Sequence, residues 1–210
     1  MLIVLTGIDG SGKTTAARAA VTAARRVGKE ALLLRNYAGR RRMSLLSTQT
    51  GIQLHPRLAD AVETVIRTTN VMVSHARAHG HPGLVIMDRH PHCQLALRQA
   101  RGLPRGRLLP FLLTKFPQPD VVVHLVIDPE QAHQRVLARG TDTETLEELT
   151  ALRAAYQSMP EYEHFTELTA SGTPEEVVAQ LTLAIAGAGE SPDGGDGQGA
   201  GAGAGAGSAP

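Results

Sequence analysis

The sequence MLIVLTGIDGSGKTT at the start of the chain constrains the fold more than any other stretch. The pattern G-x-x-x-x-G-K-[ST] is met from Gly7 to Thr14, between an apolar run at 2–5 and an Ala- and Arg-rich segment at 13–26. This order of strand, glycine loop and helix is the context in which the pattern binds phosphate. Glycines let backbone N–H groups approach phosphate oxygens, and the positive end of the following helix points at the same anion. The alternative, a glycine turn with a chance lysine, fits these flanks poorly.

Two side chains of this loop have predicted chemistry. Lys13 can reach the outer phosphates of a bound ligand, and the hydroxyl of Thr14 can ligate Mg²⁺. The loop therefore predicts a phosphate-bearing ligand held with a divalent cation.

Composition narrows the class of protein further. A chain of 210 residues suggests one domain, and its formal net charge of +1 favours neither a nucleic-acid-binding protein nor a membrane-surface protein. Cys93 is the single cysteine and cannot form an internal disulfide, which fits a reducing cytoplasm. We expect no signal peptide, because the apolar run before the loop is short, and no apolar run reaches the roughly 20 residues of a membrane span. We expect a cytoplasmic protein.

Strand and helix patterns alternate along the chain. Asp128 and Thr173 each precede a proline, as expected where a helix begins with an N-cap. The alternation predicts an α/β fold with a parallel sheet, right-handed crossovers and a ligand site at the carboxyl ends of the strands. From 187 the chain is a Gly- and Ala-rich tail that we expect to be disordered, so the predicted domain is 1–186. After the first strand, the predicted strands are 31–35, 84–87, 121–127 and 165–169, and the predicted helices are 13–26, 58–79, 94–101, 129–139, 145–157 and 174–185.

A second motif, Asp88-Arg89, follows the predicted strand 84–87. A carboxylate at that strand end can hold Mg²⁺, and the adjacent arginine can clamp a phosphate with its fork of donors. The alternative is a surface ion pair, but the motif lies where this fold places its chemistry.

Four stretches together resemble the thymidylate kinase family: LTGIDGSGKTT, GLVIMDRH, PDVVVHLVIDPEQAHQRVLARG and LTASGTPEEVVAQL. The resemblance implies a three-layer α/β/α fold of the P-loop type, with a five-stranded parallel sheet and a short lid. It implies ATP-dependent phosphorylation of a nucleoside monophosphate, dTMP or a related nucleotide, with Mg²⁺. It also implies a homodimer, since dimers are common in the family.

The resemblance also implies site residues. Lys13, Asp88, Arg89 and Asp9 would be catalytic, and Thr14 and Asp88 would hold the metal ion. The acceptor would be bound by Asp9, Arg35, Tyr37, Arg67, Arg89 and Gln94, although an ordinary solvated helix position is an equal alternative for Arg67. ATP would be bound by Gly7, Asp9, Gly10, Ser11, Gly12, Lys13, Thr14, Thr15, Arg135 and Arg139, although solvated helix positions are an equal alternative for the last two.

The chain departs from the family pattern around the acceptor. His90 replaces an aromatic residue after Asp-Arg, Leu97 falls where many members have a tyrosine, and the lid sequence has Asp142 and Glu144 where an arginine is common. These changes indicate a modified acceptor pocket. The alternatives are therefore a kinase of the same fold that phosphorylates a nucleoside hydroxyl or a specialised metabolite, and a nucleotide-binding regulatory protein with slow hydrolysis. The chain lacks the guanine-reading Asn-Lys-x-Asp of switch GTPases, which argues against the second alternative.

Two charged or titratable clusters carry weaker signals. Arg40, Arg41 and Arg42 lack interleaved aromatic residues, so a solvated loop is expected there rather than a nucleic-acid site. Five histidines gather in the sequence without a zinc-ligand spacing, so we expect surface histidines rather than a zinc site: His75, His79, His81, His90 and His92.

Overall fold

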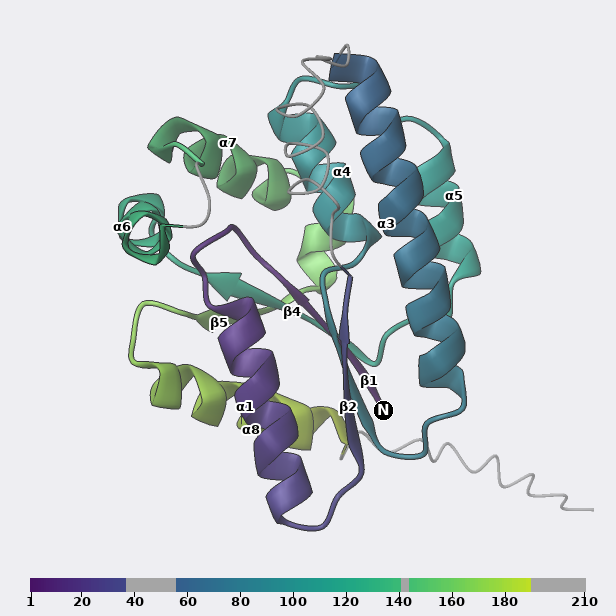
Figure 1. Ribbon diagram of the computed structural model, residues 1–210, viewed down its shortest axis with the longest axis vertical. Helices are drawn as coiled ribbons and strands as arrows, with labels where there is room; N and C mark the ends of the chain where they lie inside the picture. The colour runs from purple at the N-terminus through teal and green to yellow at the C-terminus, as the bar shows by residue number, and fades with distance from the viewer. Residues whose placement is uncertain (37–55, 141–143, 190–210) are drawn as a thin grey trace, which may run out of the picture.

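A five-stranded, fully parallel sheet forms the centre of the molecule (Figure 1). The computed structural model describes residues 1–36, 56–140 and 144–189. The strand order is β2-β3-β1-β4-β5, so the amino-terminal strand lies in the middle of the sheet. The strands are β1 (Leu2–Thr6), β2 (Ala31–Arg35), β3 (Leu84–Asp88), β4 (Val121–Val126) and β5 (Thr166–Thr169). The predicted fold class is confirmed.

Helices cover both faces of the sheet. In Figure 1, α1 and α8 lie together on one side, while α3, α4, α5 and α7 lie on the other. Strands covered on both faces read as continuous apolar runs, and β1, β2 and β4 have that character. The helices are α1 (Lys13–Arg26), α3 (Pro56–His79), α4 (Pro91–Ala100), α5 (Leu108–Lys115), α6 (Pro129–Arg139), α7 (Leu146–Gln157) and α8 (Pro174–Gly189), with a 3₁₀ helix η1 (Pro160–His164).

The predicted helix starts at Asp128 and Thr173 are confirmed by their hydrogen bonds. Asp128 Oδ1 accepts from the backbone N–H of Glu130 at 3.1 Å. Thr173 Oγ1 accepts from the N–H of Glu176, whose carboxylate accepts from the N–H of Thr173 in return. Each cap satisfies donors that a helix start leaves without an intrahelical partner.

Two helix boundaries differ from the prediction by more than two residues, and two short elements were not predicted. Helix α4 starts at Pro91 rather than at residue 94, because proline suits the first helical turn. Helix α8 continues to Gly189 rather than ending at residue 185; its last four residues are Ala-Gly-Ala-Gly, of which only the alanines favour a helix. Helix α5 and η1 were not predicted, since each is short and carries little periodic signal.

The core is aliphatic. Its fully buried members include Ile3, Leu5, Ile86, Leu125 and Leu181, with Tyr156 as the largest buried side chain. Cys93 is also buried. None of the helices in the described ranges combines the length and apolarity that crossing a bilayer requires.

The parallel register brings the carboxyl ends of three strands together. Leu5 in β1 pairs with Asp88 in β3, and Thr6 pairs with His124 in β4. The glycine loop after β1 and the Asp88-Arg89 pair at the end of β3 therefore meet at one edge of the sheet.

Candidate active site

The loop between β1 and α1 has the backbone that phosphate binding requires. Gly7, Gly10 and Gly12 have φ values of 135°, 85° and 84°, in the region that favours glycine. Gly12 occupies the N-cap position of α1 without a side-chain hydrogen bond to the helix. The first N–H groups of α1 have no partner within the helix, so they are directed into the loop as donors for an anion.

Close packing leaves no room for a side chain at Gly10. A Cβ atom built on Gly10 would collide with the backbone carbonyl of Ala132 in α6. The phosphate loop thus lies directly against the backbone of α6, which fixes the distance between the two.

Lys13 folds back over its own loop. Its Nζ donates to the carbonyl oxygens of Gly7 at 2.9 Å and Ile8 at 2.7 Å, and to Ser11 Oγ at 3.3 Å. Burial lowers the pKa of Lys13 below its usual value, while the Asp9 carboxylate 3.9 Å away opposes the shift. The amino group of Lys13 is therefore buried and held within the phosphate loop by its own hydrogen bonds.

Thr14 and Asp88 form a pair of hard oxygen ligands. Thr14 Oγ1 donates to Asp88 Oδ2 at 2.5 Å, across the gap between α1 and β3. The other carboxylate oxygen, Oδ1, is buried and has no hydrogen-bond partner among the described residues. A buried carboxylate oxygen is costly unless something satisfies it, and carboxylate plus hydroxyl oxygens suit Mg²⁺. The donor set therefore fits the metal ion that the sequence predicted.

Arg89 and Asp9 form an ion pair beside this oxygen pair. A terminal guanidinium nitrogen of Arg89 lies 2.6 Å from Asp9 Oδ1. Burial alone would lower the pKa of Arg89, but the Asp9 carboxylate outweighs burial and raises the pKa above its ordinary value. Arg89 is therefore charged at any working pH.

A first cavity of about 330 Å³ lies on the α1 and α8 side of the loop. Its walls include Gly10 and Gly12 from the loop, and Arg135 and Arg139 from α6. Arg135 also donates to the carbonyls of Ala170 at 2.9 Å and Gly172 at 3.4 Å, which ties α6 to the turn between β5 and α8. The predicted nucleotide residues Ser11 and Thr15 line this cavity too, together with Ala16, Gly172, Pro174 and Val177.

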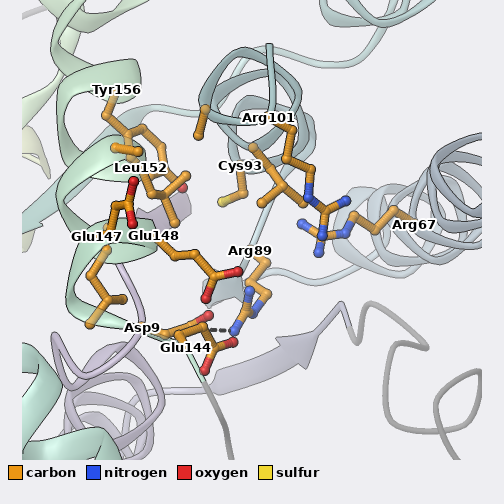
Figure 2. A pocket seen from close by; sticks show the side chains of 15 residues that line it. Asp9, Arg67, Arg89, Cys93, Arg101, Glu144, Glu147, Glu148, Leu152 and Tyr156 are labelled. Atoms are coloured by element: carbon orange, nitrogen blue, oxygen red, sulfur yellow. Dashed lines mark hydrogen bonds and ion pairs between the residues drawn. The ribbon is translucent and has the colours of Figure 1, made fainter. Parts of the chain in front are cut away.

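A second cavity of about 220 Å³ opens on the other side of the same loop. Figure 2 shows the guanidinium groups of Arg67, Arg89 and Arg101 on one side of it, and carboxylates of α7 on the other. Arg67 and Arg101 point toward one another, and Arg89 points toward Asp9 (Figure 2). Arg67 is buried, with 4% of its surface exposed. The remaining lining residues include Gly7, Cys93, Leu97, Ala100, Glu144, Glu147, Glu148, Leu152 and Tyr156.

Three residues predicted for the acceptor are not among the lining residues of this cavity. Arg35 ends β2 as an exposed residue, opposite Asp88 in the strand register. Gln94 is fully buried in α4 and donates to Thr64 Oγ1 at 3.3 Å. Tyr37 lies outside the described residues, as do Asp142 and the three arginines at 40–42.

Sequence reasoning missed several residues of the second cavity. Arg101, Tyr156, Glu147 and Glu148 carry no local motif, and only the packing of α4 against α7 brings them together. Glu148 has a visible role in the sequence as the third residue of a capping box, with Thr145 as its N-cap.

The expectation of surface histidines is wrong for three of the five. His75, His90 and His92 are buried, with His90 Nε2 lying 3.3 Å from His75 Nε2 and His90 Nδ1 lying 3.0 Å from His92 Nδ1. Burial first, then the neighbouring imidazoles, hold the pKa of His90 well below its usual value. Within the described ranges, no group of three potential ligands is arranged to bind a metal ion.

Comparisons with known proteins agree with the geometry. The family model for thymidylate kinase matches residues 5–181. A thymidylate kinase of Xylella fastidiosa (strain 9a5c) is 31% identical over 171 residues, which cover 76% of this chain and 78% of the relative. A thymidylate kinase of Xanthomonas campestris pv. campestris (strain B100) is 29% identical over 172 residues, or 76% of this chain and 71% of the relative. With the phosphate loop, the Asp-Arg strand end and the sheet order in place, this chain belongs to the thymidylate kinase family.

Proposed function

We propose that this chain transfers the terminal phosphoryl group of ATP to the phosphate of a nucleoside monophosphate, with dTMP as the acceptor to test first. Membership of the family makes the chain an ATP-using nucleoside monophosphate kinase. The observation that carries the proposal is that one loop separates two cavities. Gly10 and Gly12 face the first cavity, which we assign to ATP, while Gly7 and Asp9 face the second, which we assign to the acceptor.

Charge neutralisation explains how these residues would act. In-line phosphoryl transfer depends on positioning and on stabilising charge at the transferring group more than on covalent help. The loop N–H groups and Lys13 would hold the donor phosphates. Thr14 and Asp88 would hold Mg²⁺, which would neutralise the donor phosphates when bound. For a phosphate acceptor the attacking oxygen is already ionised, so no strong general base is needed.

Arg89 and Asp9 are assigned to the acceptor. The Arg89 guanidinium would hold the acceptor phosphate beside the loop, with Asp9 fixing the orientation of the guanidinium through their ion pair. Arg67 and Arg101 line the same cavity and would contact the other end of the acceptor, where guanidinium groups favour carbonyl oxygens as partners.

A second candidate acceptor is a hydroxyl group. The acidic side of the second cavity supports it, because Asp9, Glu144 and Glu147 could supply the general base that a hydroxyl needs. ADP release is the assay that separates the possibilities, measured with ATP and Mg²⁺ against dTMP, dUMP, dCMP, UMP and the matching nucleosides. Release that depends on a monophosphate supports the proposal. Release only with nucleosides supports the hydroxyl alternative, and release without any acceptor would indicate a hydrolase.

The Mg²⁺ site has its own test. Replacing Asp88 with Asn keeps the shape of the side chain but removes its charge, so we expect the Mg²⁺ concentration for half-maximal activity to rise at least about tenfold. Asp120→Asn is the matched control, because Asp120 lies at the start of β4 and accepts from the N–H of Leu2, away from both cavities. An unchanged Mg²⁺ dependence for Asp88→Asn would remove Asp88 from the metal site.

We also propose that two copies of the chain pair through α3. Leu58, Val65 and Met72 lie seven residues apart on this helix and are 52%, 61% and 54% exposed. Seven-residue spacing places these side chains along one stripe, and an exposed apolar stripe on a helix is suited to burial against the same stripe of a second copy. Val65→Glu should convert a dimer into a monomer by light scattering after gel filtration. Val27→Glu, at an equally apolar exposed position beside α1, should leave the dimer intact.

We propose that the protein works in the cytoplasm and without a nucleic-acid partner. A net charge of +1 and a single buried cysteine support both statements.

A further inference from the structure

Arg89 has an unusual backbone conformation for an arginine. Its φ is 79°, and it is the one non-glycine residue with positive φ in the described part of the chain. This region is unfavourable for a residue with a Cβ atom, and such a conformation persists only where the surroundings enforce it. The conformation matters, because it directs the guanidinium from the end of β3 toward Asp9 and the second cavity.

The residue that enforces it is Asn36, directly after β2. Asn36 is 2% exposed, and its Nδ2 donates to the carbonyl oxygen of Arg89 at 2.7 Å. Its backbone N–H donates to the carbonyl of Asp88 at 3.0 Å. Asn36 thus contacts the peptide groups on both sides of the Arg89 Cα atom. The N–H of Arg89 donates to Leu5 in β1 at 3.3 Å, which supports the same turn from the other side.

A third element orients the amide of Asn36. Ser74 in α3 is buried and donates its hydroxyl to Asn36 Oδ1 at 2.7 Å. Because this bond occupies the amide oxygen, the amide nitrogen must face Arg89. Ser74 therefore donates to Asn36, and Asn36 donates to Arg89. These two hydrogen bonds connect α3 to the ends of β2 and β3.

The same junction connects two arginines of the second cavity. Ser74 lies seven residues after Arg67 in α3, so the two side chains share a face of the helix. Both are buried, and Arg67 lines the cavity. A helix fixed to Asn36 at Ser74 holds Arg67 at a set distance from Arg89.

We propose that Asn36, oriented by Ser74, is a positioning residue that sets Arg89, and through α3 also Arg67, for binding the acceptor. Asn36 is not among the lining residues of either cavity, so it acts on the acceptor through Arg89. The inference rests on the proposed function, since it takes Arg89 as the residue that holds the acceptor phosphate.

Amide hydrogen exchange tests the positioning without any activity. Asn36→Asp keeps the side-chain shape but removes the donor to Arg89, and Ser74→Ala removes only the hydroxyl that orients the amide. Loss of one buried hydrogen bond corresponds to about a 5- to 100-fold change in local opening. We therefore expect exchange of the Arg89 amide to rise at least about fivefold in each variant. Thr68→Val is the matched control, since the buried hydroxyl of Thr68 on the same helix has no hydrogen-bond partner among the described residues. Exchange at Arg89 equal to that of the control would overturn the inference.

Kinetics then tests the consequence for the acceptor. The Michaelis constant for the acceptor should rise about tenfold in Ser74→Ala, while that for ATP stays within about twofold. In an Arg89→Gly background, which lacks the guanidinium and relieves the left-handed strain, Ser74→Ala should cause a smaller additional loss than in the wild type, because only its effect through Arg67 remains. Equal additional loss in that background would show that Ser74 does not act through Arg89. A wild-type protein inactive with every monophosphate would instead reject the proposed function, while the exchange experiment would still decide the inference. Ser74→Ala leaves the fold measurable even if Asn36→Asp proves too unstable to purify.

Discussion

Buried imidazoles should make the fold sensitive to mild acid. Burial lowers the pKa of His92 and of His124 to about 4, from the ordinary value near 6.5 that each group regains in the unfolded chain. Their folded pKa values are depressed, so the full stability is present above about pH 6.5, where both states are neutral. It is lost as pH falls from about 6.5 toward 4, because only the unfolded chain takes up the protons.

The size of the effect follows from the two pKa values. At pH 5, each of the two histidines costs about 2 kcal/mol relative to pH 8, or about 4 kcal/mol for the pair. Burial and the flanking imidazoles shift His90 in the same direction, which adds to the loss. Carboxylates with ordinary pKa values stay largely ionised over this range, so they contribute little. Total stabilities are about 5–15 kcal/mol, so the expected loss is a large fraction.

Urea unfolding followed by far-ultraviolet circular dichroism measures this loss, since the chain has no tryptophan to report it. The free energy of unfolding should fall by about 4 kcal/mol or more between pH 8 and pH 5, at fixed protein concentration. His92→Gln combined with His124→Gln should remove about 4 kcal/mol of that dependence. His164→Gln, at a side chain that is 80% exposed, should leave it unchanged. Equal stability at pH 8 and pH 5 would refute the reasoning, because the imidazoles would then be able to accept protons in the folded protein.

Three further predictions concern the site. Lys13→Ala should lower kcat by about 10²–10³-fold with an unchanged circular dichroism spectrum, and near-normal turnover would contradict the role of the loop. Arg89→Ala should raise the Michaelis constant for the acceptor far more than that for ATP. Arg98→Ala, in α4 and outside the lining of both cavities, should alter neither constant. Gly10→Ala should weaken ATP binding and lower the melting temperature, because the added Cβ atom would meet the Ala132 carbonyl. Gly28→Ala is the control: Gly28 also has a positive φ but open space around it, so the variant should lower stability without changing the affinity for ATP. Calorimetric ATP affinity of Gly10→Ala equal to that of the wild type would show that the loop can move away from α6.

The fold could be predicted because its signals are local. The glycine loop, the apolar runs and the proline-marked helix starts each depend on neighbouring residues, and the five strands lie within a residue of their predicted bounds. Helix α5 was missed because eight residues hold too few turns for a periodic pattern to be recognised.

The acceptor side of the site could be predicted only in part. Lys13, Thr14, Asp88 and Arg89 belong to motifs, so their proximity follows from the strand order. Arg101 and Tyr156 reach the same cavity from α4 and α7, and nothing in either segment indicates that the helices meet. Burial of His75 was equally hidden, because it depends on Phe116 stacking over the imidazole from a distant part of the chain.

The self-bonded state of Lys13 has a consequence for ligand selection. Its ammonium group already donates to three oxygen atoms within the loop. An incoming anion must therefore replace these hydrogen bonds, because the group has no unpaired donor waiting for a ligand. A lone inorganic phosphate offers little beyond what the carbonyls of Gly7 and Ile8 supply. A polyphosphate chain also contacts the start of α1 and the Thr14–Asp88 oxygens, and these added contacts can offset the loss of the hydrogen bonds of Lys13. The loop therefore selects ligands by the number of contacts that they make at once.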